Sequence, residues 1–197
     1  MKYKLEVIKM ESEFNQGADI EFVDKMDSKT ENQIERGFNL NEGYIQLPIT
    51  IDHLPPKLDV LNYELLLKDE LHCSLVCIKN LTNKYGPDIE KKIIDLFNDF
   101  TLNYDIALVN FHNEFRLVHR KERVSVIAMC NISNIDIFYK LLNEKLGISE
   151  VIPPMHVTLY TLQPNMGIGV NTDSELQATE IVSPDAIYID SLNGTKK

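Results

Sequence analysis

Two short motifs in this sequence carry the side chains best suited to acid–base chemistry. They are HCSL at residues 72–75 and HVTL at residues 156–159, and both have the order histidine, apolar residue, hydroxyl residue, apolar residue. Histidine has an ordinary pKa of about 6.5, so its imidazole can give or take a proton near neutral pH. One copy could therefore serve as a general base and the other as a general acid. The hydroxyls could donate hydrogen bonds to a charged oxygen.

The first motif lies in a predicted strand, LHCSLVCI at residues 71–78. Successive side chains of a strand point to opposite faces of the sheet. We therefore expect His72 and Ser74 to share one face, with Cys73, Leu75 and Cys77 on the other, packed face. Cys73 occupies an apolar position of the motif, so it is not predicted to be a nucleophile.

The second motif lies in a similar predicted strand, MHVTLYTL at residues 155–162. Strict alternation puts His156, Thr158 and Tyr160 on one face. Tyr160 could stack on a nucleobase, since every base has an aromatic face. The alternative is a tyrosine that packs against a neighbouring strand.

The remaining histidines and the basic residues give less specific signals. By composition, roughly 3% of histidines match the motif, so one match carries little information and a pair among five histidines carries much more. His53 and His112 match no motif and are expected to be surface or capping residues. The basic run RLVHRKER (116–123), which contains His119, predicts a solvated hairpin turn, with a phosphate-steering flank as the alternative. Lys68 and Lys79 flank the first motif and are secondary candidates for phosphate binding.

The paired motifs resemble those of the two-histidine (2H) phosphoesterase superfamily, which includes the LigT-like RNA 2′,3′-cyclic phosphodiesterases. Both motifs match at all four positions, and the resemblance covers roughly residues 43–192. It implies a bilobal α+β fold, in which two antiparallel sheets flanked by helices meet at a central cleft and each lobe contributes one motif. It also implies catalysis by His72 and His156, with Ser74 and Thr158 binding the phosphate.

The resemblance implies a cytoplasmic hydrolase that needs no metal or other cofactor. Its substrate would be a cyclic or 2′,5′-linked nucleotide, or an RNA 2′,3′-cyclic phosphate end that opens to a 2′-phosphate. One histidine would activate water and the other would protonate the leaving ribose oxygen, in an order that the sequence leaves open. The alternatives are a nucleotide-binding sensor that keeps the fold without turnover, and a structural protein in which both histidines are incidental.

Charge and composition restrict the partners. The 197 residues include 30 acidic and 20 basic side chains, for a net charge of −10. This excludes a broad surface for long duplex nucleic acid but allows a local pocket for one small nucleotide or oligonucleotide. No apolar run approaches the roughly 20 residues of a membrane span, and no secretory signal or disulfide framework is apparent. We expect a soluble, cytoplasmic protein without membrane contact, and a monomer.

Strands and helices that would position the motifs alternate along the chain in an α+β order. We expect an N-terminal extension of uncertain structure (1–42), one domain (43–192) and a short tail (193–197). One helix is predicted after Gly86-Pro87, and another with Ser133 as its cap and Gly147 at its end. The GIG sequence at residues 167–169 is predicted to be a turn. Strands are predicted at residues 3–7, 43–51, 60–67, 71–78, 104–111, 115–119, 123–130, 155–162 and 186–192.

Overall fold

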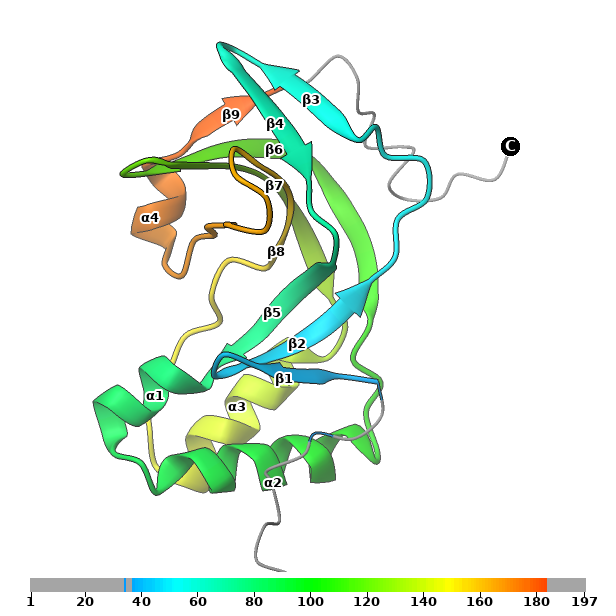
Figure 1. The fold of residues 1–197 in the computed structure, drawn as a ribbon. Coiled ribbons are helices and arrows are strands. Elements are labelled where there is room, and N and C mark those ends of the chain that lie inside the picture. Colours follow the sequence, from blue (N-terminus) through cyan, green and yellow to red (C-terminus); the bar gives the residue numbers. More distant parts are fainter. Residues whose placement is uncertain (1–33, 35–36, 184–197) are drawn as a thin grey trace, which may run out of the picture. The chain divides into compact units, whose positions relative to one another are not determined.

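The computed structural model of this chain describes residue 34 and residues 37–183, drawn in colour in Figure 1. All of them belong to the compact unit formed by residues 32–197. The strands predicted at residues 3–7 and 186–192, and the tail at 193–197, lie outside the described residues.

Strands of the described region form one open, antiparallel sheet of nine strands. Its main path runs β1 (Asn39–Asn41), β2 (Tyr44–Ile49), β5 (Leu71–Cys77), β8 (His156–Thr161), β7 (Arg123–Ile132), β6 (Leu108–Arg120) and β9 (Glu180–Val182). A hairpin of β3 (Lys57–Val60) and β4 (Tyr63–Leu67) joins it where β4 pairs with β8. The α+β class is confirmed, but the prediction of two sheets is wrong here, because β5 and β8 pair directly. β1 also lies ahead of the expected domain start at residue 43.

Helices of the described region are four in number: α1 (Ile78–Tyr85), α2 (Ile89–Thr101), α3 (Ile135–Leu146) and α4 (Asp173–Gln177). In Figure 1, α1, α2 and α3 lie together at one end of the sheet, and α4 lies beside the β6–β7 hairpin. Phe97 and Phe100 on the apolar face of α2 pack edge-on against Phe138 of α3. None of the helices in the described residues has the length and apolarity to cross a membrane.

Both predicted helices are present, with one difference at a cap. α3 ends at Gly147, whose φ of 63° is the left-handed conformation predicted for that position. Ser133 does not cap α3: its hydroxyl donates to the Asp105 carbonyl at 2.9 Å and accepts the Ala107 N–H at 2.8 Å. The hydroxyl therefore ties the start of α3 to the segment before β6 instead of capping the helix.

Strand predictions failed where a turn contains apolar residues. Residues 60–67 were expected to form one strand, but Leu61, with a φ of 53°, begins the turn between β3 and β4. The two strands expected at 104–111 and 115–119 are one strand, β6, with an irregular register between Phe111 and Phe115. Helix α1, which follows β5 without a loop, was not predicted. Its sequence IKNLTNKY has too few apolar residues for a clear helical pattern, and only Ile78 and Leu81 are buried.

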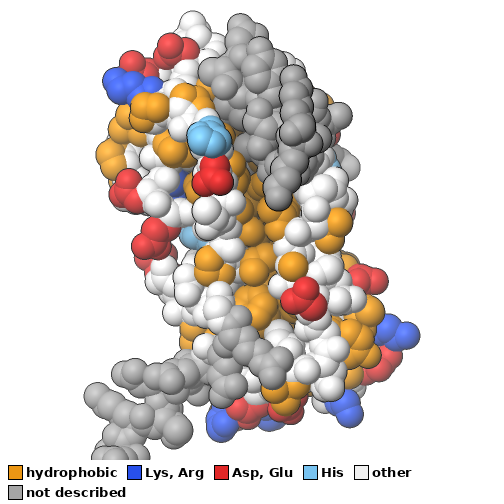
Figure 2. All heavy atoms as spheres, turned by 90° about the vertical axis from the view of Figure 1, so that its right-hand side faces the viewer, with side chains coloured by type: hydrophobic (Ala, Val, Ile, Leu, Met, Phe, Trp, Pro, Cys, Tyr) orange, Lys and Arg blue, Asp and Glu red, His pale blue; other side chains and the backbone are white. Residues whose placement is uncertain are grey.

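Charged side chains are scattered on the face shown in Figure 2. Apolar side chains form a band down this face, and the described Lys and Arg side chains visible there do not gather into a patch. The described residues visible on this face therefore offer no row of cations to a long polyanion, in keeping with the acidic composition.

Candidate functional site

The two histidine motifs lie side by side in the middle of the sheet. β5 and β8 pair in antiparallel orientation through the residue that separates the histidine from the hydroxyl in each motif. In this register His72 lies beside Thr158, and Ser74 lies beside His156. All four side chains line one pocket of about 700 Å³, a volume in the usual range for small-molecule sites.

Both motif strands contain a β-bulge at the same motif position. The pairing of β5 with β2 skips Leu75, and the pairing of β8 with β7 skips Leu159. Each is the apolar residue that directly follows the motif hydroxyl. One extra residue reverses the alternation of side chains beyond it, so the faces expected from strict alternation hold only as far as the hydroxyl.

Tyr160 therefore lies in the core, which corrects the expectation that it shares a face with His156. Its side chain has 0% exposure, and its hydroxyl donates to the Pro55 carbonyl at 2.8 Å. Its ring cannot stack on a bound base in this conformation. The bulge on β5 has the converse effect on Cys77, which lines the pocket instead of sharing the buried face of Cys73. A different tyrosine lines the pocket from a strand next to the motifs: Tyr44 of β2.

His156 is held in a defined orientation by the backbone. Its Nδ1 lies 2.7 Å from the Pro154 carbonyl oxygen, and because a carbonyl only accepts, Nδ1 must carry the hydrogen. In the neutral ring, Nε2 is then left with a lone pair. Burial lowers the pKa of His156 below 6.5, and the hydrogen bond to Pro154 acts in the opposite direction.

His72 is also neutral in the free pocket. Its pKa is lowered to about 4, mainly by burial, then by the positive charge of Lys68 and by His156. At neutral pH such an imidazole is in its neutral form, with one N–H and one ring nitrogen that can accept a proton. The two histidines thus differ in surroundings: His72 has a cation nearby, and His156 has a carbonyl oxygen behind its ring.

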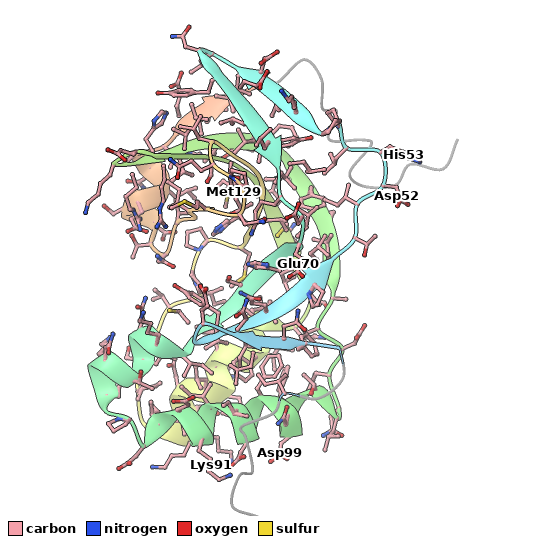
Figure 3. All side chains as sticks on the ribbon, viewed as in Figure 1. Asp52, His53, Glu70, Lys91, Asp99 and Met129 are labelled. Carbon is pink, nitrogen blue, oxygen red and sulfur yellow. The ribbon has the colours of Figure 1, made fainter. Side chains whose placement is uncertain are left out.

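Lys68 enters the pocket from the end of β4. Its backbone N–H donates to the carbonyl of Leu159, the bulge residue of the second motif, at 2.9 Å. Burial lowers the pKa of its ammonium group, while the carboxylates of Glu70 and Glu42 raise it. Figure 3 marks Glu70, which follows Lys68 closely in the chain and also lines the pocket. Of the two flanking lysines, the pocket includes Lys68 and not Lys79.

The GIG sequence is not a free turn but covers the motif side chains. A Cβ added at Gly169 would lie 2.1 Å from His156 Nε2, and one added at Gly167 would lie 3.3 Å from Thr158 Cγ2. Neither glycine has a φ in the left-handed region, so neither is required by backbone conformation. Gly169 is needed for space, and Gly167 makes a close contact that small shifts can relieve. We call residues 167–170 the covering segment. The only sequence signal for it was two glycines spaced two residues apart beyond the second motif.

Apolar contacts hold the covering segment on the sheet. Its residues Ile168 and Val170 belong to a small cluster with Val118, Ile127 and Met129 of β6 and β7, and Met129 is marked in Figure 3. The N–H of Ile168 also donates to the buried Ser125 hydroxyl at 3.0 Å. Glycines facing the motifs thus alternate with apolar residues facing this cluster.

The other sequence candidates lie at the margin of the pocket or away from it. The basic run forms the predicted β6–β7 turn, and Arg120 and Arg123 in it also line the pocket. Arg120 is paired with Glu175 at 3.0 Å. His112 is hydrogen-bonded to an asparagine, and His119 packs edge-on against a tyrosine. Figure 3 marks His53 on the loop after β2, and none of these three histidines lines the pocket.

Acidification should destabilise the folded protein through His72. Its pKa is about 4 when folded and 6.5 in the reference state, so the unfolded chain binds more protons between these values. The stability contributed by neutral His72 is present above about pH 6.5 and is lost as the pH falls toward about 4. We expect a loss of about 1–2 kcal/mol of unfolding free energy after solvent screening. Denaturant unfolding at about pH 7 and about pH 5 measures it, and a His72→Asn variant with an equal loss would contradict the assignment.

Comparisons of this chain with protein-family models, with curated proteins and with solved structures give no match. Within the described residues, no group of three or more His, Cys, Asp or Glu side chains is arranged to hold a metal ion. Function is therefore inferred from the side chains of the pocket.

Proposed function

We propose that this chain is a metal-independent phosphodiesterase that hydrolyses a cyclic or 2′,5′-linked nucleotide by two-histidine acid–base catalysis. The observation that carries the proposal is the shared pocket, to which adjacent antiparallel strands each contribute one imidazole and one hydroxyl. A phosphate bound there would be within reach of two imidazoles, one from each strand. The resemblance of both motifs to the 2H phosphoesterases supports the same chemistry. The equivalent bulges make β2–β5 and β7–β8 similar halves of the single sheet, and this similarity supports a relation to the two lobes of that superfamily.

His72 is the general base in this proposal, and His156 is the general acid. Neutral His72 takes a proton from water as the water oxygen attacks phosphorus. A bound phosphate raises the pKa of a nearby imidazole, and the Pro154 carbonyl favours the charged form of His156 in particular. As the bond from phosphorus to the leaving ribose oxygen breaks, Nε2–H of His156 donates its proton to that oxygen. The products are a phosphate monoester and a hydroxyl, and solvent returns the proton from His72 to His156.

Positive charge and hydroxyl groups would stabilise the phosphoryl group. Ser74 and Thr158 can each donate a hydrogen bond to a non-bridging oxygen, and the Lys68 ammonium group supplies the charge. This cation lies in a partly buried site, where its interaction with phosphate is stronger than in water. An acidic protein can thus bind one phosphate group without a broad basic surface.

Lys68→Met tests the role of the pocket cation. The Lys68 charge lowers the pKa of His72, so its removal should raise that pKa and move the acidic limb of the kcat/KM profile to higher pH. We also expect kcat/KM to fall about 10- to 100-fold through the lost phosphate contact. Lys79→Met removes the same charge at an exposed position outside the pocket and should change neither property. An acidic limb that stays in place in Lys68→Met would contradict the role of Lys68 beside His72.

The substrate class is tested by hydrolysis in the presence of EDTA. The panel contains 2′,3′-cyclic nucleotides, 3′,5′-cyclic nucleotides, cyclic dinucleotides, 2′,5′-oligoadenylates and RNA with a cyclic phosphate end. We expect hydrolysis of at least one member, and a rate lower by about 10²-fold or more in the His72→Ala/His156→Ala double variant. Calorimetric binding without any product would identify a nucleotide sensor instead. Unchanged hydrolysis by the double variant would overturn the proposed mechanism.

A further inference from the structure

Gln46 is a polar residue of the pocket that the proposed chemistry does not use. It lies on β2 directly opposite Ser74, on the strand face that carries Tyr44, and lines the same pocket. Its side chain is more than nine-tenths buried, with 6% exposure. A buried glutamine at this position is within one strand spacing of the proposed phosphate site.

The Gln46 amide has no hydrogen-bond partner within the described part of the chain. Every fully enclosed side-chain nitrogen or oxygen in that part does have a partner, so the amide atoms of Gln46 retain some accessible surface, and Gln46 is a lining residue of the pocket. Leaving a largely buried amide unpaired costs free energy unless a ligand or water forms its missing hydrogen bonds. One amide offers an adjacent donor and acceptor in one plane.

The residues beside Gln46 include an aromatic ring that suits a flat group. Tyr44 and Cys77 line the pocket beside it, and the neighbouring Cys77 side chain, together with burial, raises the pKa of Tyr44 to about 12. Tyr44 is therefore a neutral phenol whose ring is available for stacking. The hydroxyl of Tyr139 is already used, because it donates to the Leu75 carbonyl at 3.0 Å. The pocket cations come from after β4 (Lys68), from β6 (Arg120) and from β7 (Arg123), and the charges of Arg120 and Glu42 act on the Tyr44 pKa in opposite directions.

We propose that Gln46 recognises the nucleobase of the substrate, and that this base is adenine; the inference rests on the proposed phosphodiesterase function. Of the two purines, adenine presents an amino donor next to a ring-nitrogen acceptor on both of its exposed edges, so a carboxamide can match it with two hydrogen bonds in either orientation; guanine offers such a pair on one edge only. Gln46 is thus a specificity residue, one strand away from the hydroxyl that binds the phosphate. Tyr44 contributes the face on which the base stacks.

Gln46→Glu converts this preference into a measurable switch. A carboxylate has two acceptors and no donor, so it fits the adjacent N–H groups of guanine and leaves adenine poorly matched. We expect the wild type to favour the adenine 2′,3′-cyclic nucleotide about tenfold or more in kcat/KM, and Gln46→Glu to favour guanine by a similar factor. Gln46→Leu should lose base preference. Gln177→Glu adds the same charge on exposed α4, outside the pocket, and should keep the preference of the wild type.

Binding of the four nucleoside 2′-monophosphates, measured by calorimetry, separates this inference from the proposed function. If no cyclic nucleotide is cleaved but the binding preference switches in Gln46→Glu, the hydrolytic function fails and the assignment of Gln46 stands. If Gln46→Glu weakens cleavage and binding of all four bases equally, Gln46 acts on phosphate or ribose and the inference is overturned. A wild type without preference for adenine in either measurement also overturns it.

Discussion

Alanine in place of His72 or His156 is expected to lower kcat/KM for the cleaved nucleotide by about 10²–10⁴-fold, the usual contribution of a positioned acid or base. Among the described histidines, only these two line the pocket, each beside the hydroxyl residue of the other motif. Each single variant therefore retains one imidazole where two proton transfers are needed. The double variant should be scarcely worse than either single variant, because groups that act as one unit are not additive. Steady-state rates of the three variants on the same substrate measure this.

The matched control for these variants is His112→Ala. His112 is an exposed histidine of β6 that is hydrogen-bonded to Asn131 at 2.9 Å and lies outside the pocket. The His112→Ala variant should retain the activity of the wild type. Thermal unfolding of each variant separates lost chemistry from lost folding. If either pocket variant kept activity within about threefold of the wild type while folded, two-histidine catalysis would be wrong.

Gly169→Ala should be the most damaging glycine-to-alanine change among the described residues. The added Cβ would lie 2.1 Å from His156 Nε2, a separation that no relaxed structure allows. His156 cannot retreat freely, because Nδ1 is hydrogen-bonded to the Pro154 carbonyl. Either the imidazole or the covering segment must therefore move, which displaces the proposed acid from the phosphate. We expect kcat to fall about 100-fold, and the strain to cost about 1–3 kcal/mol of stability.

Gly167→Ala provides a graded comparison on the same segment. Its Cβ would lie 3.3 Å from Thr158 Cγ2 and 3.6 Å from the flexible Lys68 side chain, so small shifts can relieve the contact. Its rate should fall less than about tenfold, and its melting temperature should stay close to that of the wild type. The two rates and two melting temperatures are directly comparable. Equal behaviour of the two variants would show that the covering segment does not press on His156.

The chemistry of the site could be anticipated from sequence only over short distances. Alternation along a strand is a local property, so it correctly put His72 with Ser74 and His156 with Thr158 on one face each. Beyond the hydroxyl residues it misplaced Cys77 and Tyr160. Their directions depend on the bulges, and a bulge is defined by the partner strand and not by the strand that contains it.

Features made by distant segments could not be predicted. In the sequence, Lys68 and Lys79 are equivalent lysines that flank the first motif. Only the pairing of β4 with β8 places Lys68 in the pocket. Gln46 carried no motif at all, and its relevance comes from lying opposite Ser74. Gly167 and Gly169 read as a turn because neither composition nor periodicity reveals what lies beneath a segment.

By itself, the sequence determined the residue types suited to proton transfer, the strands that carry them, the α+β class and the negative net charge. These follow from side-chain chemistry and from periodicities of a few residues. Tertiary structure alone decided that β5 and β8 are neighbours, that one pocket contains both motifs, and which cation, glutamine and glycines surround them. Register and packing between segments far apart in the chain set those relations, since they minimise the free energy of the whole fold and not of any one segment.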